Sequence, residues 1–154
     1  MEVAVNKLIQ IRWLIRRDMP EVLQIERDSF PQPWTDEDFL CCLRQKNCVG
    51  MVAEWDHQIV GYMLYELHRS RLTLLNLAVL PKARRKAVGA LLINRLKDKL
   101  SPERRSSIDL DVRETNLDAQ LFFQSRGFVA TGVIGGHYPD TCEDAFSFIY
   151  RADW

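Results

Sequence analysis

The 154-residue chain has no excess charge, because 21 lysine and arginine residues balance 21 aspartate and glutamate residues. It therefore lacks the general field that would attract nucleic acid or an anionic membrane. No stretch approaches the roughly 18 apolar residues of a membrane helix, and the first residues show no signal-peptide pattern. We expect a cytoplasmic protein with no membrane or direct nucleic-acid contact, and the length suits one domain over residues 1–154.

The chain also lacks a metal-binding pattern. Its four cysteines form no CxxC pair, and its three histidines do not cluster with them. In structural metal sites the ligand residues are separated by short, recurring spacings. We therefore expect no metal, and free thiols in a reducing compartment. The cysteines are Cys41, Cys42, Cys48 and Cys142.

Two nucleotide-binding signatures are missing as well. The sequence contains neither the GxxxxGK[ST] of a P-loop nor the GxGxxG of a dinucleotide-binding turn. What it does contain is an alternation of short strand and helix patterns without repeats or linkers. The expected strands are 11–16, 49–55, 59–67, 72–79, 106–113, 128–133 and 145–151, and the expected helices are 18–30, one starting at 35, 88–100 and 116–126.

This order predicts an α/β fold whose sheet carries helices on both faces. The early hairpins should be antiparallel, and the later strand–helix–strand unit should be parallel. Local signals support the boundaries: Asp18 and Glu21 have capping-box spacing, as do Thr35 and Asp38. The last strand pair is expected to turn at Gly135–Gly136.

The most informative segment is a basic loop between a buried strand and a helix. Three consecutive cations at positions 84–86 precede small residues at 87, 89 and 90. Cations at a helix N-terminus oppose the helix dipole, which favours anions there. A bound polyanion would reverse that unfavourable interaction, and small residues let backbone N–H groups approach phosphate oxygens. The loop could also be an ordinary solvated basic turn, but the combination favours phosphate binding.

Five motifs in order make the chain resemble the GNAT acyltransferase superfamily, whose cofactor loop reads [QR]-x-x-G-x-[GA]. The most similar group within it is the ribosomal-protein-alanine N-acetyltransferases, and the resemblance covers about residues 12–151. The motifs, as they stand here, are FPQPW at Phe30–Trp34, NLAV at Asn76–Val79, LDVRETN at Leu110–Asn116, AQLFFQSRGF at Ala119–Phe128, and HYP at His137–Pro139 followed by EDA at Glu143–Ala145.

The resemblance implies a GNAT-like mixed, mostly antiparallel twisted sheet of six to seven strands flanked by about four helices. It implies acetyl-CoA as cofactor and the α-amine of a protein N-terminus as acceptor, fed between the Pro31–Trp34 loop and the Gly136–Asp140 hairpin. A monomer or weak dimer is expected. The implied cofactor-binding residues are Leu77, Ala78 and Val79 for the pantetheine arm, Arg84, Arg85, Lys86, Ala87, Val88, Gly89 and Ala90 for the pyrophosphate, and Asn116.

Two departures from this pattern affect the binding loop and the general base. Ala87 replaces the first glycine of the loop, which is harmless if its φ is negative and strained if φ is positive. Asp111 stands where the group has a glutamate base, and its side chain is one methylene shorter. A base is needed because an α-amine with a pKa near 8 is partly protonated at neutral pH. Because the aspartate side chain is short, we expect Asp111 to act through a relayed water. A solvent-facing strand aspartate is the alternative.

A third departure affects the general acid, because Phe123 replaces the tyrosine of the group. Phenylalanine cannot protonate the leaving thiolate, so the sequence predicts a slow enzyme or an acid placed elsewhere. Tyr138 and His137 are the candidates, although Tyr138 could instead be a pocket wall and His137 a surface residue. Trp34 could be a substrate lid or part of the core.

Two other functions stay open at this stage. The acceptor could be a lysine side chain, a polyamine or another small amine. Alternatively, the missing tyrosine and glycine could mark a non-catalytic acyl-CoA-binding sensor.

Overall fold

The computed structural model describes residues 8–84 and 87–153. Seven strands form one mixed sheet in the order β1-β2-β3-β4-β5-β7-β6. The strands are β1 (Gln10–Trp13), β2 (Cys48–Trp55), β3 (Gln58–Leu67), β4 (Arg71–Val79), β5 (Ser107–Arg113), β6 (Val129–Tyr138) and β7 (Glu143–Arg151). The helices are α2 (Met19–Ser29), α3 (Asp36–Leu43), α4 (Val88–Lys97) and α5 (Leu117–Ser125), with 3-10 turns at Arg16–Asp18 and Pro81–Ala83.

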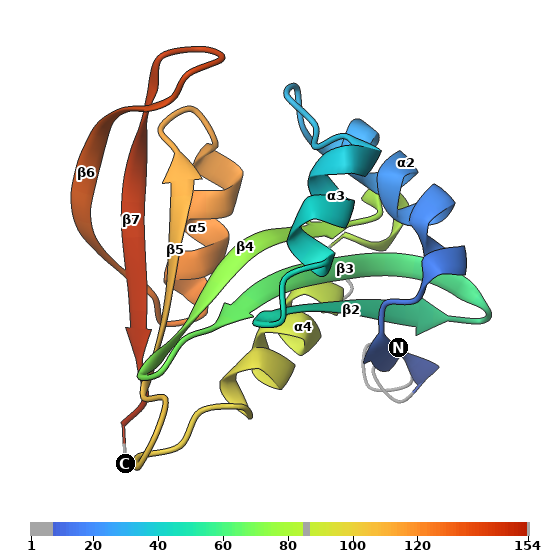
Figure 1. Cartoon of the computed structure of the whole chain (residues 1–154), viewed down its shortest axis with the longest axis horizontal. Helices are drawn as coiled ribbons and strands as arrows, with labels where there is room; N and C mark the ends of the chain where they lie inside the picture. The colour runs from blue at the N-terminus through green and yellow to red at the C-terminus, as the bar shows by residue number, and fades with distance from the viewer. Residues whose placement is uncertain (1–7, 85–86, 154) are drawn as a thin grey trace.

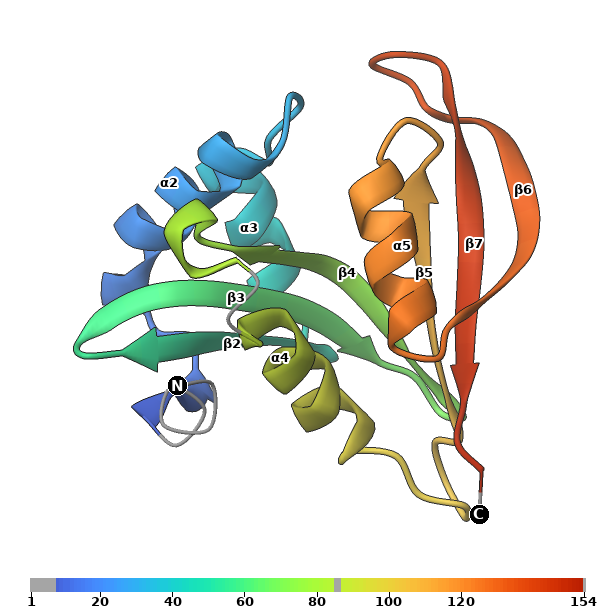
Figure 2. The ribbon, with the colours of Figure 1, turned by 180° about the vertical axis from the view of Figure 1, so that it is seen from behind.

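Helices cover both faces of the sheet, as the alternating pattern predicted (Figures 1 and 2). On one face α2 and α3 bury a cluster around Val22, Ile25, Phe39 and Tyr62. On the other face α4 and α5 bury a larger cluster that includes Leu92. The mixed, mostly antiparallel sheet with four flanking helices is therefore confirmed. None of the described helices is long and apolar enough to cross a bilayer.

Among the strands that the structure describes, one pair is parallel, β4 with β5. This pairing confirms the predicted strand–helix–strand unit. Along β5 the side chains alternate as expected, with Ile108, Leu110 and Val112 buried and Asp111 exposed. Thr35 and Asp38 form the predicted capping box, in which each side chain accepts the other's backbone N–H at 3.2 and 2.8 Å.

The predicted turn at Gly135–Gly136 is wrong. Strand β6 runs through both glycines to Tyr138, and the hairpin turns between Tyr138 and Glu143. The pairing of β6 with β7 shifts register between Ile134 and Tyr138. The two glycines lie in this bulge, where Gly136 has φ +58°, so the glycine pair bends a strand rather than ending it.

The expected capping box of α2 is also wrong. The Asp18 side chain makes no capping bond to α2 and instead accepts from the Ile15 N–H at 2.9 Å. It also accepts two hydrogen bonds from the Arg12 guanidinium, at 2.8 and 2.9 Å. The Arg12 guanidinium also donates a hydrogen bond to the Glu54 carboxylate at 2.9 Å. The aspartate therefore joins β1 to the start of α2 as a buried, paired carboxylate.

We expect Asp18→Asn to lower the free energy of unfolding by about 2 kcal/mol at pH 7, because hydrogen bonds to charged groups contribute that much. Burial alone would raise the pKa of Asp18, but the Arg12 guanidinium and the Ile15 N–H lower it below its usual value. The stabilisation is therefore present above the unfolded pKa of about 3.9 and is lost as the pH falls through the folded pKa. Urea denaturation should show the wild-type advantage shrinking below about pH 4. Asp28→Asn, on the exposed face of α2, is the control, and an equal deficit for Asp18→Asn at pH 7 and pH 3 would contradict this assignment.

Candidate active site

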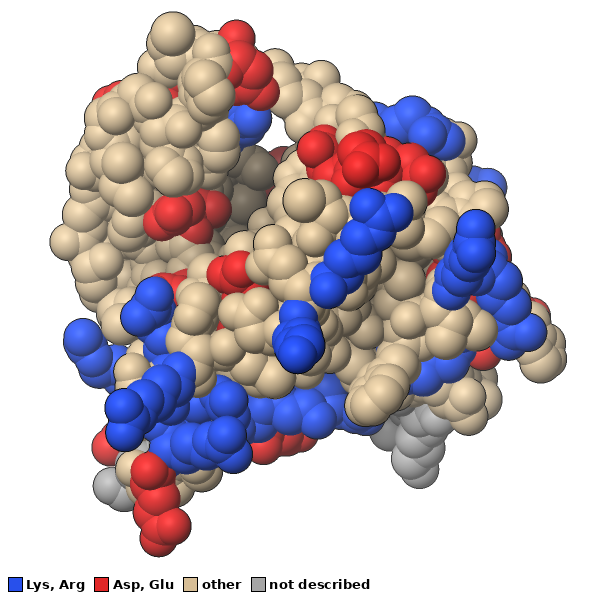
Figure 3. Space-filling model, in the orientation of Figure 1, with Lys and Arg blue, Asp and Glu red and all other residues tan. Residues whose placement is uncertain are grey.

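The candidate site is a cleft at the point where β4 and β5 separate. Within the described chain these strands pair only along Arg71–Thr73 and Ser107–Asp109, and beyond this they diverge (Figures 1 and 2). The opening holds a cavity of about 780 Å³. Figure 3 shows it as a hollow beside α3, with acidic side chains gathered over the first turn of that helix.

The walls of the cleft come from segments far apart in sequence. The floor is Leu74–Leu77 of β4, one wall is the Phe30–Trp34 loop with part of α3, and the opposite wall is Leu110–Arg113 of β5. Tyr138 and Asp140 complete that second wall from the β6–β7 hairpin. The two candidate catalytic residues, one on β5 and one on the hairpin, therefore face the same cavity.

Asp111 presents a partly exposed carboxylate to this cleft from the outward face of β5. One oxygen accepts a hydrogen bond from the Ser147 hydroxyl at 2.9 Å. The other lies 3.6 Å from His137 Nε2. With 38% of its side chain exposed, the carboxylate can exchange protons with water and keeps lone pairs free to accept one.

Tyr138 lies at the end of β6, half-buried against Arg113. The guanidinium stands 4.0 Å from the centre of the tyrosine ring, within the range of a cation–π contact. Burial raises the pKa of Tyr138, and the neighbouring Arg113 charge partly opposes this effect. The phenol is therefore protonated at neutral pH and available as a hydrogen-bond donor or proton donor.

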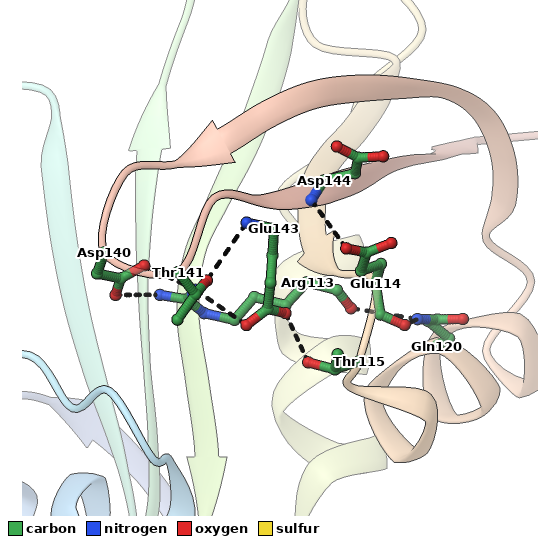
Figure 4. A network of polar contacts seen from close by, with 8 residues as sticks. All are labelled: Arg113, Glu114, Thr115, Gln120, Asp140, Thr141, Glu143 and Asp144. Atoms are coloured by element: carbon green, nitrogen blue, oxygen red, sulfur yellow. Dashed lines mark hydrogen bonds and ion pairs between the residues drawn. The ribbon is translucent and has the colours of Figure 1, made fainter.

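Arg113 also fixes the hairpin tip beside β5 (Figure 4). Its two terminal nitrogens donate to the two carboxylate oxygens of Asp140, at 3.0 and 2.9 Å. This guanidinium lowers the pKa of Asp140, and a hydrogen bond from Thr115 lowers the pKa of Glu143. Bidentate pairing sets orientation as well as distance, so the network fixes Tyr138 with respect to Asp111.

The predicted pantetheine segment lies along the opened edge of β4. Leu77 lines the cavity, whereas Ala78 is buried as a member of the core cluster that α2 and α3 cover. The Val79 carbonyl accepts a hydrogen bond from Arg84 Nε at 3.1 Å, and the same guanidinium donates to the Ser29 hydroxyl at 3.1 Å. Arg84 thus reaches back to β4 and α2.

The predicted phosphate-binding residues continue into the first turn of α4, and Arg85 and Lys86 lie outside the described residues. Val88 is buried in the core, so only its backbone could contact a ligand. Gly89 has a packing role, because an added Cβ would lie 3.0 Å from the Phe122 ring. Its absence of a side chain lets α4 approach α5, and Ala90 is partly buried in the same turn.

Ala87 is in the left-handed region, with φ +66° and ψ +9°. The sequence left open whether φ at Ala87 is negative and harmless or positive and strained. The structure has the positive, strained value. A non-glycine residue there costs about 1–2 kcal/mol, and the greater unfolded-state entropy of glycine offsets part of any gain from replacement.

We expect Ala87→Gly to stabilise the protein by a net 0.5–1 kcal/mol, roughly, and to raise the melting temperature by about 1–4 °C. Ala90→Gly is the matched control, because position 90 lies in α4 and has no positive φ, so glycine relieves no strain there and should destabilise by up to about 1 kcal/mol. Calorimetric melting of both variants checks the pair. Destabilisation by both substitutions would show that the strain at Ala87 is absent in solution.

The remaining candidates are placed as follows. Asn116 lines the cavity and caps α5, with its side-chain oxygen accepting the Ala119 N–H at 3.2 Å. Trp34 is both wall and core, since it lines the cavity and packs on Phe39 at 5.2 Å between ring centres. Phe123 is buried and lines the cavity with its ring.

Two of the cysteines, Cys42 and Cys48, have thiols that burial makes unreactive. Cys41 and Cys42 line the cleft, and all four thiols are free. Burial raises the pKa of Cys42, and it raises the pKa of Cys48 to about 12, so both thiols stay protonated at neutral pH. Among the described residues, no group of His, Cys, Asp and Glu is arranged to hold a metal ion.

Sequence reasoning missed Glu26, a carboxylate only 1% exposed that also lines the cavity. It accepts from the Tyr62 hydroxyl, the Asn76 amide and the Trp34 backbone N–H. The available signal was an acid in the apolar stripe of α2, since charged residues are rarely buried without partners. Its partners, however, lie on β3, β4 and a loop, which local pattern cannot identify.

Comparison with known proteins identifies the family. Residues 19–128 match the sequence pattern of the family described as "Acetyltransferase (GNAT) family". A [ribosomal protein bS18]-alanine N-acetyltransferase of Salmonella typhimurium is 26% identical over 129 residues, covering 84% of this chain and 86% of that protein. The crystal structure of the ribosomal-protein-S18-alanine N-acetyltransferase from Escherichia coli superposes with a TM-score of 0.83 at 23% identity, covering 95% of each chain. Ard1 from Thermoplasma volcanium superposes with a TM-score of 0.85 at 24% identity, covering 96% of this chain and 99% of that one. Because the family match extends over more than half of the sequence, and the observed fold agrees with it, the chain belongs to the GNAT acetyltransferase family.

Proposed function

We propose that this GNAT N-acetyltransferase transfers an acetyl group from acetyl-CoA to the α-amine of a protein N-terminus, such as that of a ribosomal protein. The main support is that one cleft, at the separation of β4 and β5, contains both a carboxylate, Asp111, and a protonated phenol, Tyr138. The relative from Salmonella typhimurium, which is named for the alanine of a ribosomal protein, supports the choice of acceptor.

The donor would lie along β4 and reach the N-terminus of α4. Backbone groups of Leu77–Val79 would hold the pantetheine arm, and Arg84–Ala90 would hold the pyrophosphate. The opened edge of β4 supports the first assignment. The positive end of the α4 dipole and the N–H groups of its first turn, which a helix leaves without intrahelical partners, support the second. Asn116 would contact the donor from the start of α5.

In the transfer, the amine nitrogen bonds to the thioester carbonyl carbon and the carbon–sulfur bond breaks. Asp111 would accept the proton that leaves the amine, through a water that spans the gap left by its short side chain. Tyr138 would give its proton to the departing thiolate, because Phe123 offers no hydroxyl. The prediction that Phe123 makes turnover slow is still untested.

Binding and transfer can be measured separately. Calorimetry with acetyl-CoA tests donor binding, and thiol release with a panel of N-terminal peptides, a lysine peptide and polyamines tests the acceptor. We expect binding together with fastest release for the free N-termini. Fastest release with a polyamine or the lysine peptide would replace the proposed acceptor. Binding without release for any amine would favour an acyl-CoA sensor, and absence of binding would refute the transferase.

A further inference from the structure

The proposed chemistry makes no use of Glu26, although this residue closes the acceptor-side loop at both ends. At the start of the loop, the Glu26 backbone carbonyl accepts the Phe30 N–H at 3.1 Å. At its end, the Glu26 side-chain Oε2 accepts the Trp34 N–H at 2.9 Å. Pro31, Gln32 and Pro33 between these two anchors are exposed. The first bond is the last backbone bond of α2, so the Glu26 side chain contributes the second bond, which holds the far end of the wall segment.

The other carboxylate oxygen of Glu26 is bound to the sheet. Oε1 accepts from Asn76 Nδ2 at 2.7 Å and from the Tyr62 hydroxyl. Asn76 lies on the floor of the cleft, next to Leu75, where β4 bulges against β3. The carboxylate thus connects the loop on one side of the cleft directly to the floor beneath the expected thioester.

Aromatic packing supports the same segment less specifically. The Trp34 ring packs on Phe39, and Phe39 packs edge-on against Tyr62 at 5.8 Å. These contacts hold the side chain of Trp34, whereas its backbone N–H is held by Glu26. Since three donors converge on Glu26 in a buried site, losing the carboxylate would leave them without their acceptor.

We propose that Glu26 is a positioning residue of the acceptor site, holding the Phe30–Trp34 loop at the distance from β4 that admits the acceptor amine beside the thioester. This inference rests on the proposed function for the identity of the acceptor. Misplacement of a binding wall by about 1 Å can reduce a rate about 10²-fold, so the loop's anchor should affect acceptor use. Donor binding, which we assign to the backbone of Leu77–Val79 and to the start of α4, should be unaffected.

Three variants separate positioning from stability and from proton transfer. Tyr62→Phe removes a sheet-side bond and keeps the loop bond. The double variant Glu26→Met with Tyr62→Phe removes all three hydrogen bonds that the carboxylate accepts and also the hydroxyl that would otherwise stay buried without a partner. Glu26→Gln keeps an oxygen that can accept the Trp34 N–H but cannot take up a proton as a carboxylate does. For each variant we would measure kcat, the KM for the acceptor peptide, acetyl-CoA affinity, and hydrogen exchange at the Trp34 amide.

We expect the double variant to raise the acceptor KM about tenfold, equivalent to one hydrogen bond to a charged group, with acetyl-CoA affinity unchanged. Tyr62→Phe should keep the wild-type acceptor KM. Glu26→Gln should keep it too, because the glutamine oxygen can still accept the Trp34 N–H. A collapse of kcat in Glu26→Gln with unchanged acceptor KM would show that Glu26 accepts a proton, which would overturn the proposal.

Hydrogen exchange at the Trp34 amide keeps this inference distinct from the proposed function. The double variant should lose Trp34 protection, whereas Tyr62→Phe should retain it. If the wild-type protein transfers acetyl to no amine, the proposed function fails, and this exchange measurement still decides whether Glu26 fixes the loop. Equal protection in the wild type and the double variant would refute the anchoring role.

Discussion

Replacing Asp111 by asparagine is expected to lower turnover by about 10²–10³-fold, within the range typical of a general base. Asparagine keeps the size of the side chain and can still accept the Ser147 hydrogen bond, so the fold of β5 should be preserved. It cannot accept a proton from the amine. Acetyl-CoA affinity, measured by calorimetry, should stay at the wild-type value, because the proposed donor contacts lie on β4, α4 and Asn116.

The pH dependence of this defect gives a second measurement. An acceptor α-amine has a pKa of about 8, so above this pH it arrives already deprotonated. The Asp111→Asn deficit should therefore be larger at pH 7 than at pH 9. A deficit that is constant across this range would indicate that Asp111 acts on binding or structure rather than as a base.

Asp109 provides a matched control, because it lies two residues away on the same face of β5. Its carboxylate bonds to the Thr73 hydroxyl at 2.5 Å and to Arg71 at 3.0 Å, where β4 and β5 are still paired. Asp109→Asn should therefore keep wild-type turnover. Equal losses in the two variants, or no loss in Asp111→Asn, would remove Asp111 from the proposed mechanism.

Local sequence pattern predicted those parts of the fold that depend on near neighbours. The alternation along β5 and the Thr35–Asp38 capping box arise within a few residues, and both are observed. The Gly135–Gly136 turn was misplaced because glycine pairs serve turns and bulges alike. Only the register of β6 against β7 distinguishes the two, and register is a long-range property.

The same distinction explains what could be predicted of the site. The resemblance to the family indicated Asp111, and the departure at Phe123 made Tyr138 a candidate acid; both line one cleft. The sequence did not indicate Glu26, whose partner Asn76 is 50 residues away. It also did not indicate the role of Arg113, whose partner Asp140 is 27 residues away. Such contacts depend on how β4, β5 and the hairpin meet, which neither helical nor strand periodicity encodes.

Replacing Tyr138 by phenylalanine is expected to lower kcat by about 10²-fold, the lower end of the range for general acid catalysis. The effect should lie at this end because burial raises the pKa of Tyr138, whereas a thiol similar to cysteine has a pKa of about 8.5. Proton transfer from the phenol to the thiolate is therefore uphill. Because the phenol loses its proton only above its usual pKa of about 10, the contribution of Tyr138 should persist through mildly alkaline pH.

A second substitution tests whether the missing hydroxyl is the cause of this defect. Phe123 lines the same cavity and packs edge-on against Phe128 at 5.4 Å between ring centres. Phe123→Tyr, which restores the family's tyrosine, should recover much of the turnover lost in Tyr138→Phe and raise that of the wild type if proton donation limits the rate. Phenylalanine at 138 keeps an aromatic ring for the Arg113 contact, so the hairpin should stay in place and the melting temperature should change little. Wild-type turnover in Tyr138→Phe would mean that the thiolate departs without Tyr138, and would leave this residue only as a wall of the cleft.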